Sequence, residues 1–203
     1  MLLDWNRIDK IEFASPPKKV PAVKPLFGTV ETTRREKFTG FIQWDRDERV
    51  YSDKLDGQTK DGGISMPFSE IKSIEKKGNT CLAILKSDRE HLVWGSNDVN
   101  EANRGLVVLI PGKGQVDIPW SSFKKVVFSD KEETGPGYDQ FPTPKPLTGK
   151  VYLFEEKEYS GTLVYDFDET LDLETLEGTD NGLRYTIPFR NIKSIRPKNE
   201  AFS

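Results

Sequence analysis

The chain contains a repeated segment, and this repeat limits its possible folds more than any other feature. Residues 25–75 align with residues 146–196 without a gap, at a constant offset of 121, and 16 of the 51 positions are identical. Both copies end in Ile-Lys-Ser-Ile, at residues 71–74 and 192–195. A unit of about 50 residues is marginally stable alone. We therefore expect small units that share interfaces.

A weaker copy lies between these two. It matches the first copy at the pairs Cys81/Gly28, Pro119/Pro67, Trp120/Phe68, Phe123/Ile71 and Val126/Ile74. We call residues 25–77 the first repeat, residues 78–128 the second repeat and residues 146–197 the third repeat.

The remaining segments lie outside the three repeats. In the segment 1–13, residues 2–13 match residues 117–128, the end of the second repeat, with Trp5 at the place of Trp120. They are expected to form the terminal strand of a repeat that is either truncated or swapped onto another barrel. Residues 14–24 and 129–145 are proline-rich and indicate extended linkers, and residues 198–203 form a tail.

Each repeat reads as a series of short strands. In residues 38–44, every second residue is one that can face a core, at Phe38, Gly40, Ile42 and Trp44. This period of two is typical of a half-buried strand. A glycine inside a strand indicates a bend. Asp56-Gly57 and Glu177-Gly178 predict turns, and residues 68–71 predict a single helical turn. No segment has helical periodicity over ten residues, so the sequence predicts an all-β chain of about three tandem small five-stranded barrels.

The third repeat resembles the Sm-like and SH3-like small-barrel proteins. Residues 158–173 are similar to the first Sm motif, a Gly-x-Leu strand followed by an acidic turn, and Asn191-Ile192 with Ile195 is similar to the end of the second motif. The repeats also resemble an uncharacterised type of bacterial repeat that ends in Ile-Pro-Trp/Phe-x-x-Ile. The resemblance implies five curled strands. It places Asp172 at the position of an Asn with which family members contact RNA, and Asn191, in the second motif, is a further candidate binding residue.

The RNA-binding pattern is incomplete. Leu171 and Asp172 replace the family's Met and Asn, and Phe189-Arg190 replaces its Arg-Gly pair. The first repeat carries ten basic and ten acidic side chains, the second carries six basic and five acidic ones, and the third carries six basic and ten acidic ones. Because nucleic-acid binding needs clustered Lys and Arg, nucleic acid is an improbable partner, and an Sm-like RNA binder stays an alternative.

Acidic side chains form the most distinctive polar feature. They follow the second predicted strand of the first and third repeats, at Asp45, Asp47, Glu48, Asp166, Asp168 and Glu169. Such oxygen ligands suit calcium, with a solvated turn at the end of the strand as the simpler explanation. No other cofactor is expected. Trp44, Trp94 and Tyr165 are candidate binding residues, with packing in the core as the simpler explanation.

The chain has one Cys and one His. This scarcity disfavours Cys/His zinc sites and most nucleophile-histidine arrangements. Cys81 is expected to be a buried thiol, and no run of about 18 apolar residues predicts a membrane span. The sequence thus favours a non-enzymatic interaction or scaffold module that binds a protein or a cell-envelope component. The compartment stays open: cytoplasmic by default, periplasmic or secreted if a signal peptide lies upstream of Met1.

Overall fold

The computed structural model describes residues 7–12, 23–130 and 142–197 and is all-β, as the sequence predicts. Residues 7–12 form no strand. The rest of the predicted N-terminal strand, most of both predicted linkers and the predicted tail lie outside the described residues.

Each repeat contributes two hairpins, and in the first and second repeats a further strand follows the second hairpin. The first repeat contains β1 (Phe27–Thr32), β2 (Lys37–Gln43), β3 (Lys54–Thr59), β4 (Gly62–Pro67), η2 (Phe68–Glu70) and β5 (Ile71–Lys77). The second contains β6 (Thr80–Leu85), β7 (Glu90–Val93), η3 (Asn97–Val99), β8 (Leu106–Ile110), β9 (Gly114–Ile118) and β10 (Phe123–Phe128). The third contains β11 (Thr148–Tyr152), β12 (Glu158–Thr162), β13 (Thr175–Asp180), β14 (Leu183–Pro188) and η5 (Phe189–Asn191).

Matching positions of the first and third repeats have the same local backbone. Trp44 bridges to Glu48, and Tyr165 bridges to Glu169. The two residues that follow each aromatic have a left-handed backbone, with φ of 45° and 66° in the first repeat and 48° and 70° in the third. The repeated sequence therefore encodes a repeated turn that reverses the chain after the second strand.

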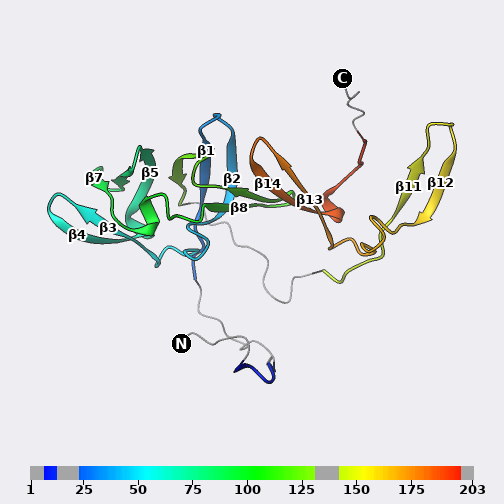
Figure 1. Ribbon diagram of the computed structural model, residues 1–203, viewed down its shortest axis with the longest axis horizontal. Helices are drawn as coiled ribbons and strands as arrows, with labels where there is room; N and C mark the ends of the chain where they lie inside the picture. Colours follow the sequence, from blue (N-terminus) through cyan, green and yellow to red (C-terminus); the bar gives the residue numbers. More distant parts are fainter. Residues whose placement is uncertain (1–6, 13–22, 131–141, 198–203) are drawn as a thin grey trace.

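The first and second repeats exchange hairpins. β1 and β2 pair with strands of the second repeat, β10 and β8, and β6 of the second repeat pairs with β5 of the first. The strand pairing thus crosses the boundary between residues 77 and 78. One five-stranded half has the order β10-β1-β2-β8-β9, and β10 then joins β5, β6 and β7. Figure 1 shows the hairpin β3–β4 beside β5 and β7, away from β1 and β2.

The register of this exchange is nearly two-fold symmetric. In the pairing of β10 with β5, Val126 lies opposite Ile74, and these two residues hold matching positions of their repeats. Phe41 lies opposite Leu109, and the matching residues Trp94 and Gln58 form the corresponding bridge. Symmetric contacts of this kind are those of an isologous interface, here formed inside one chain.

The third repeat adds to this assembly through one hairpin. Its strand β14 pairs with β9, with Tyr185 opposite Val116, while β11 and β12 form a separate two-stranded sheet. Figure 1 shows β11 and β12 at the far end of the molecule, apart from β13 and β14. Among the described residues the sheets are open, and β13 and β7 are the end strands of the ten-stranded sheet.

The hydrophobic core lies between the two exchanged repeats. Trp44 is 0% exposed, and its ring contacts those of Trp120 and Phe123 at centroid distances of 5.8 and 5.2 Å. Its indole N–H donates to the Asp98 carbonyl at 3.1 Å. A residue of the first repeat is thus buried by the second, so neither core is complete alone.

Two glycines show why the repeat sequence contains glycine inside strands. A Cβ on Gly40 would lie 2.2 Å from the Leu109 carbonyl oxygen. A Cβ on Gly57 would lie 2.3 Å from a methyl group of Val93. Gly40 therefore allows the close approach of β8 to β2. The turn predicted at Asp56-Gly57 is wrong, because Gly57 lies inside β3, where the packing of the second repeat requires it. The turn predicted at Glu177-Gly178 is wrong as well, because Gly178, at the matching place, lies inside β13.

Candidate interaction surface

The third repeat exposes side chains at positions that are core in the first repeat. Val30, Trp44 and Ile74 are 0% exposed, whereas the matching Val151, Tyr165 and Ile195 are 41%, 37% and 45% exposed. The sequence predicts the same core for both copies, yet only one copy has a core around it.

The difference has a structural cause. Val30 lies opposite Val126 of β10, and Ile74 lies opposite the same residue. Within the described residues, no strand occupies the corresponding place beside β11. The third repeat therefore keeps its apolar positions but lacks the repeat that would cover them.

Further exposed aromatic residues of the third repeat lie in the β11–β12 hairpin, at Tyr152 and Phe154, and in the acidic turn that follows β12, at Phe167. Phe154 is 91% exposed, Tyr152 is 70% exposed and Phe167 is 98% exposed. Nine of the fourteen large hydrophobic side chains that stand exposed in the described residues belong to the third repeat. Exposed apolar side chains concentrated in one part of a protein are typical of an interaction site. We call Val151, Tyr152, Phe154, Tyr165, Phe167 and Ile195 the third-repeat surface.

The candidate binding residues lie in different surroundings. Trp44 is in the core and offers no surface to a ligand, and Trp94 is half-buried. Tyr165 packs against Phe189 at a centroid distance of 5.2 Å and belongs to the third-repeat surface. Asn191 is exposed, and its side chain donates to the Lys113 carbonyl at 3.3 Å.

Asp172 is held by its own repeat. It accepts bonds from the Arg190 guanidinium at 2.9 and 3.0 Å and from the Lys145 backbone N–H at 2.8 Å. The backbone bond from Lys145, followed by the bond from Arg190, lowers the pKa of Asp172. This carboxylate therefore fastens the start of the third repeat to η5, and the structure does not bring it together with Trp44 or Trp94.

Sequence reasoning missed most of the third-repeat surface. Four of its residues are not candidates from the sequence: the alignment marks Val151 and Ile195 as core, and it matches Phe154 and Phe167 with polar residues of the first repeat. The residues themselves give no signal that distinguishes the two copies, since the third repeat keeps the apolar pattern of the first.

The acidic turn of the first repeat is tied to the second repeat. Asp45 is 0% exposed and accepts from the backbone N–H and the guanidinium of Arg104 and from the Asn97 amide. Arg104 also pairs with Asp47 at 2.6 Å. This turn therefore contributes to the exchange interface, a role for Arg104 that its sequence context does not indicate.

Glu48 has an unusual protonation equilibrium. Burial, followed by the neighbouring Asp47 and Asp98 carboxylates, raises the pKa of Glu48 to about 8. In the third repeat, burial and Asp168 raise the pKa of the matching Glu169. Among the described residues no basic side chain pairs with Asp166, Asp168 or Glu169, so here the turn lacks the equivalent of Arg104.

The raised pKa predicts how stability depends on pH. The folded chain binds the Glu48 proton more tightly than the unfolded chain does. Its contribution is thus complete below about pH 4.5 and is lost as the pH rises through about 8. We expect Glu48→Gln to remove this loss, so that native stability falls relative to the variant between about pH 5 and pH 8. Urea unfolding across this range measures the difference, with the exposed Glu90→Gln as control. A constant difference between native chain and Glu48→Gln would contradict the assignment.

Calcium stays a prediction for these turns. In the described part of the chain no three His, Cys, Asp or Glu side chains converge in a way that could hold a metal ion. Thermal unfolding with millimolar calcium addresses the question, and an unchanged melting temperature would exclude it.

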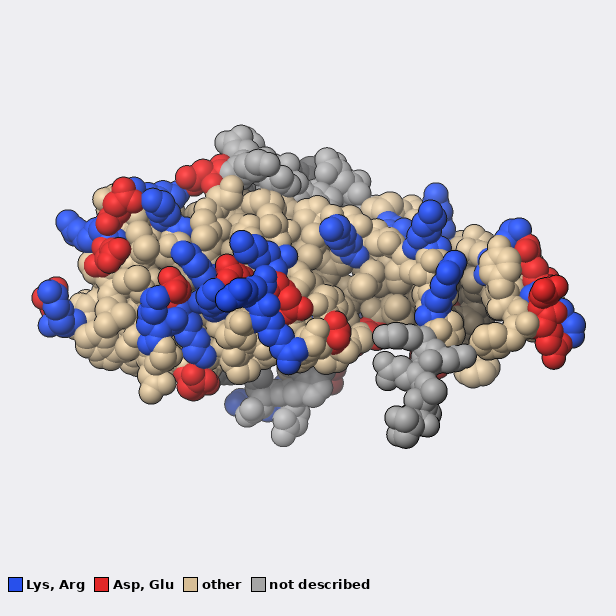
Figure 2. Space-filling model, turned by 90° about the horizontal axis from the view of Figure 1, so that it is seen from above, with Lys and Arg blue, Asp and Glu red and all other residues tan. Residues whose placement is uncertain are grey.

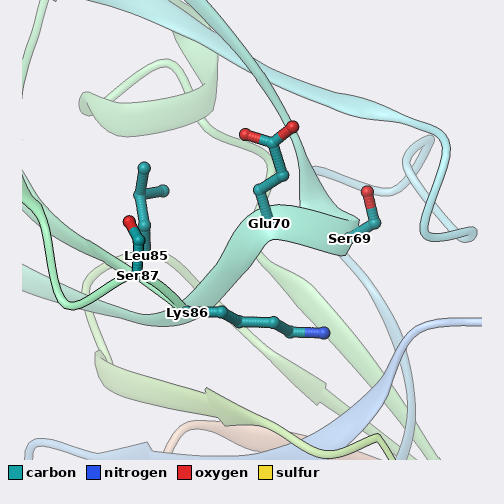
Figure 3. Close-up of a pocket in the computed structure, with 5 residues that line it drawn as sticks. All are labelled: Ser69, Glu70, Leu85, Lys86 and Ser87. Atoms are coloured by element: carbon teal, nitrogen blue, oxygen red, sulfur yellow. The ribbon is translucent and has the colours of Figure 1, made fainter.

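Two shallow hollows are not built like ligand pockets. The first holds about 250 Å³ and is lined by Ser69, Glu70, Leu85, Lys86 and Ser87. Figure 3 shows the Glu70 and Lys86 side chains pointing in different directions, so their charges do not converge. The second holds about 450 Å³ beside Asp168, Glu169 and Glu174 of the third repeat. Small-molecule sites need converging polar groups in an apolar cavity, and neither hollow has them.

Charge is mixed over most of the surface. Figure 2 shows Lys and Arg interspersed with Asp and Glu, and acidic side chains gathered at the end where β11 and β12 lie. The third repeat has six basic and ten acidic side chains, a net charge of −4. Such a surface repels a phosphate backbone.

The thiol is placed as expected. Cys81 is 0% exposed, and burial raises its pKa to about 12, so it has almost no thiolate at neutral pH. His91 is half-buried on β7.

Compared with family models, curated proteins and solved structures, the chain matches none of them. The described residues contain no helix with the length and apolar character needed to cross a membrane.

Proposed function

We propose that this chain is a non-enzymatic interaction and scaffold module, and that the third-repeat surface is where it binds another protein. One observation carries the proposal. Positions that the first repeat buries against the second are exposed in the third repeat, at Val151, Tyr165 and Ile195.

The mode of binding follows from the exchange inside the chain. The first repeat is completed by strands of another repeat, through backbone pairing of β1 with β10 and of β2 with β8. Strand addition of this kind is a common way for proteins to bind an extended segment or a hairpin of a partner. Within the part of the chain that the structure describes, the outer edges of β11 and β12 pair with no other strand and are available for it.

The fold is consistent with a scaffold of small barrels. The half with the order β10-β1-β2-β8-β9 has five antiparallel strands, the number that the SH3-like and Sm-like resemblance implies. On our proposal each exchanged half is one such barrel, built from two repeats. The linked units would place several binding surfaces on one chain and raise the effective concentration of their partners.

Other groups support a binding role rather than a catalytic one. The Cys81 thiol is buried and protonated, and Asp45 is engaged by Arg104. Asp172 is engaged by Arg190. These side chains have structural partners that account for their positions.

Site-specific photo-cross-linking in cells that carry the native gene tests the proposal. We expect a photoreactive amino acid at Phe154 to give a discrete protein adduct, because this side chain is 91% exposed in the third-repeat surface. The same amino acid at Leu92, which is 48% exposed on the second repeat, is the matched control and should give none. Equal labelling at both positions, or no adduct from Phe154, would contradict the proposed function.

A further inference from the structure

We propose that the partner of the third repeat is the third repeat of a second copy of this chain, and that the two exchange hairpins as the first and second repeats do. This inference rests on the proposed function and names the partner of the same surface.

The glycines of the third repeat support a missing repeat. At Gly40 a Cβ would collide with the Leu109 backbone of the second repeat, and at Gly28 it would lie 2.4 Å from the Val127 carbonyl oxygen. At the matching Gly161, no described residue lies within 4 Å of the same Cβ position. At Gly149, the only close neighbour is the Leu163 side chain of the same repeat. In the first repeat these glycines are needed because the backbone of another repeat approaches them. The third repeat keeps the glycines, although no such backbone lies near them in the described residues.

The register of the existing exchange fits two identical repeats. At its centre Val126 lies opposite Ile74, and these positions match one another. Lys125 lies opposite Glu75, and Val127 lies opposite Ser73. Because Lys125 and Ser73 hold matching positions, as do Val127 and Glu75, the second pair is the first with the two repeats interchanged. An antiparallel pairing with this symmetry can be formed by two copies of one sequence around a two-fold axis.

Ile195 is the residue that would lie on that axis. It holds the position of Ile74, which is 0% exposed, but is itself 45% exposed. In a pair of third repeats each Ile195 would lie opposite the other and would be covered by β11 of the partner copy.

The edges that the exchange requires are open. In the first two repeats the second strand of one repeat pairs with the third strand of the other, as β2 pairs with β8. The matching strands are β12 and β13. β13 is an end strand of its sheet, and β12 pairs only with β11 among the described residues. Two copies could therefore join β12 to β13 twice without breaking an existing pairing.

The association of the third repeat with the second is symmetric as well. Tyr185 of β14 lies opposite Val116 of β9, which are matching positions, and Arg184 and Thr186 lie opposite Asp117 and Gln115. Symmetric pairing is thus the way in which repeats of this chain contact one another, and a partner of the same sequence is the most economical occupant.

Charge sets a condition on this dimer. Each third repeat carries a net charge of −4, so two of them repel one another. The apolar surface and the strand pairing must overcome this repulsion, and salt screens it. Dimerisation should therefore strengthen between about 50 and 500 mM salt, the opposite of an association held by opposite charges.

Sedimentation of the full 203-residue chain tests the inference. We expect a species of twice the 23.1 kDa chain mass at micromolar concentration. Gly161→Ala should give the monomer mass, since its methyl group is accommodated in one copy but collides with β13 of the partner copy. Gly63→Ala is the matched control and should stay dimeric, because its Cβ meets only the Gln58 side chain at 3.7 Å.

A second variant reports on geometry and does not depend on how Gly161→Ala folds. Ile195→Cys should form a disulfide between two chains under mild oxidation, since residues opposite one another in antiparallel strands have Cα atoms about 4.5–5.5 Å apart, within disulfide range. Adding Gly161→Ala should abolish it.

A monomeric native chain, or an Ile195→Cys variant that does not cross-link, would overturn the inference. The proposed function fails separately: a Phe154 adduct with a different protein would keep the binding surface and replace its partner, whereas the absence of any adduct would remove both.

Discussion

Replacing Gly40 by alanine is expected to lower the free energy of unfolding by about 3 kcal/mol, the upper end of the usual range for overfilling a closely packed site. The added methyl group would lie 2.2 Å from the Leu109 carbonyl oxygen and 2.8 Å from its carbonyl carbon. Both atoms are backbone, so no side-chain rotation relieves the contact. The strands β2 and β8 must separate, and their pairing joins the two repeats.

Gly63→Ala is the control for this prediction. Gly63 lies on the edge strand β4, and its Cβ position has only ordinary van der Waals contacts. An alanine there should change the unfolding free energy by less than about 1 kcal/mol, because an exposed strand position tolerates a methyl group. Urea unfolding followed by circular dichroism measures both. Equal stability of the two variants would show that β8 does not lie against Gly40.

Replacing Trp44 by alanine is expected to cost about 3–5 kcal/mol, the usual loss for a large buried aromatic. Trp44 is 0% exposed and packs against Phe68, Trp120 and Phe123. The variant also leaves the Asp98 carbonyl without the indole donor. We expect the first and second repeats to unfold in one cooperative transition in the native chain. In the variant they should no longer do so, because the Trp44 ring lies in the core that they share.

The matching residue of the third repeat provides the comparison. Tyr165 is 37% exposed and has one ring contact, with Phe189. Tyr165→Ala should cost less than about 1.5 kcal/mol in dilute solution, since little apolar surface is buried there. Denaturation monitored by the fluorescence of the remaining tryptophans distinguishes the two variants. A Tyr165→Ala loss as large as that of Trp44→Ala would mean that the third repeat has a core of its own.

Local features of the fold were predictable from the sequence. The alternation around Gly40, Ile42 and Trp44 correctly marks β2, and all three are buried. Residues 68–70 form the predicted helical turn, η2, and residues 111–113 form the hairpin turn between β8 and β9. These features depend on a few neighbouring residues, so a short pattern is sufficient to specify them.

The pairing between repeats could not be predicted from the same patterns. Alternation shows which face of a strand is buried, but it is the same whether β1 pairs with β5 of its own repeat or with β10 of the next. The same limit explains the wrong turn predicted at Gly57. A glycine is needed there because a side chain of the second repeat packs against it. For the candidate site, Tyr165 was found through its aromatic character, and Phe154 and Ile195 were not. Their exposure depends on which strands lie beside β11, and a local pattern does not encode this.

The central claim is that the repeats are completed by strands of one another. Disulfide trapping tests it most directly, because two cysteine pairs distinguish the two pairings of β1. Thr29 lies opposite Val127 of the second repeat. If each repeat closed on itself, Thr29 would lie opposite Glu75, the matching residue of its own β5. The buried Cys81, with its raised pKa, does not interfere.

We predict that Thr29→Cys with Val127→Cys forms an intramolecular disulfide under mild oxidation. Thr29→Cys with Glu75→Cys should not, because β10 lies between β1 and β5 and separates them by about 10 Å, beyond disulfide range. Non-reducing mass spectrometry of the two variants gives the answer. A disulfide in the Thr29/Glu75 pair and none in the Thr29/Val127 pair would contradict the exchange and, with it, the role proposed for the third repeat.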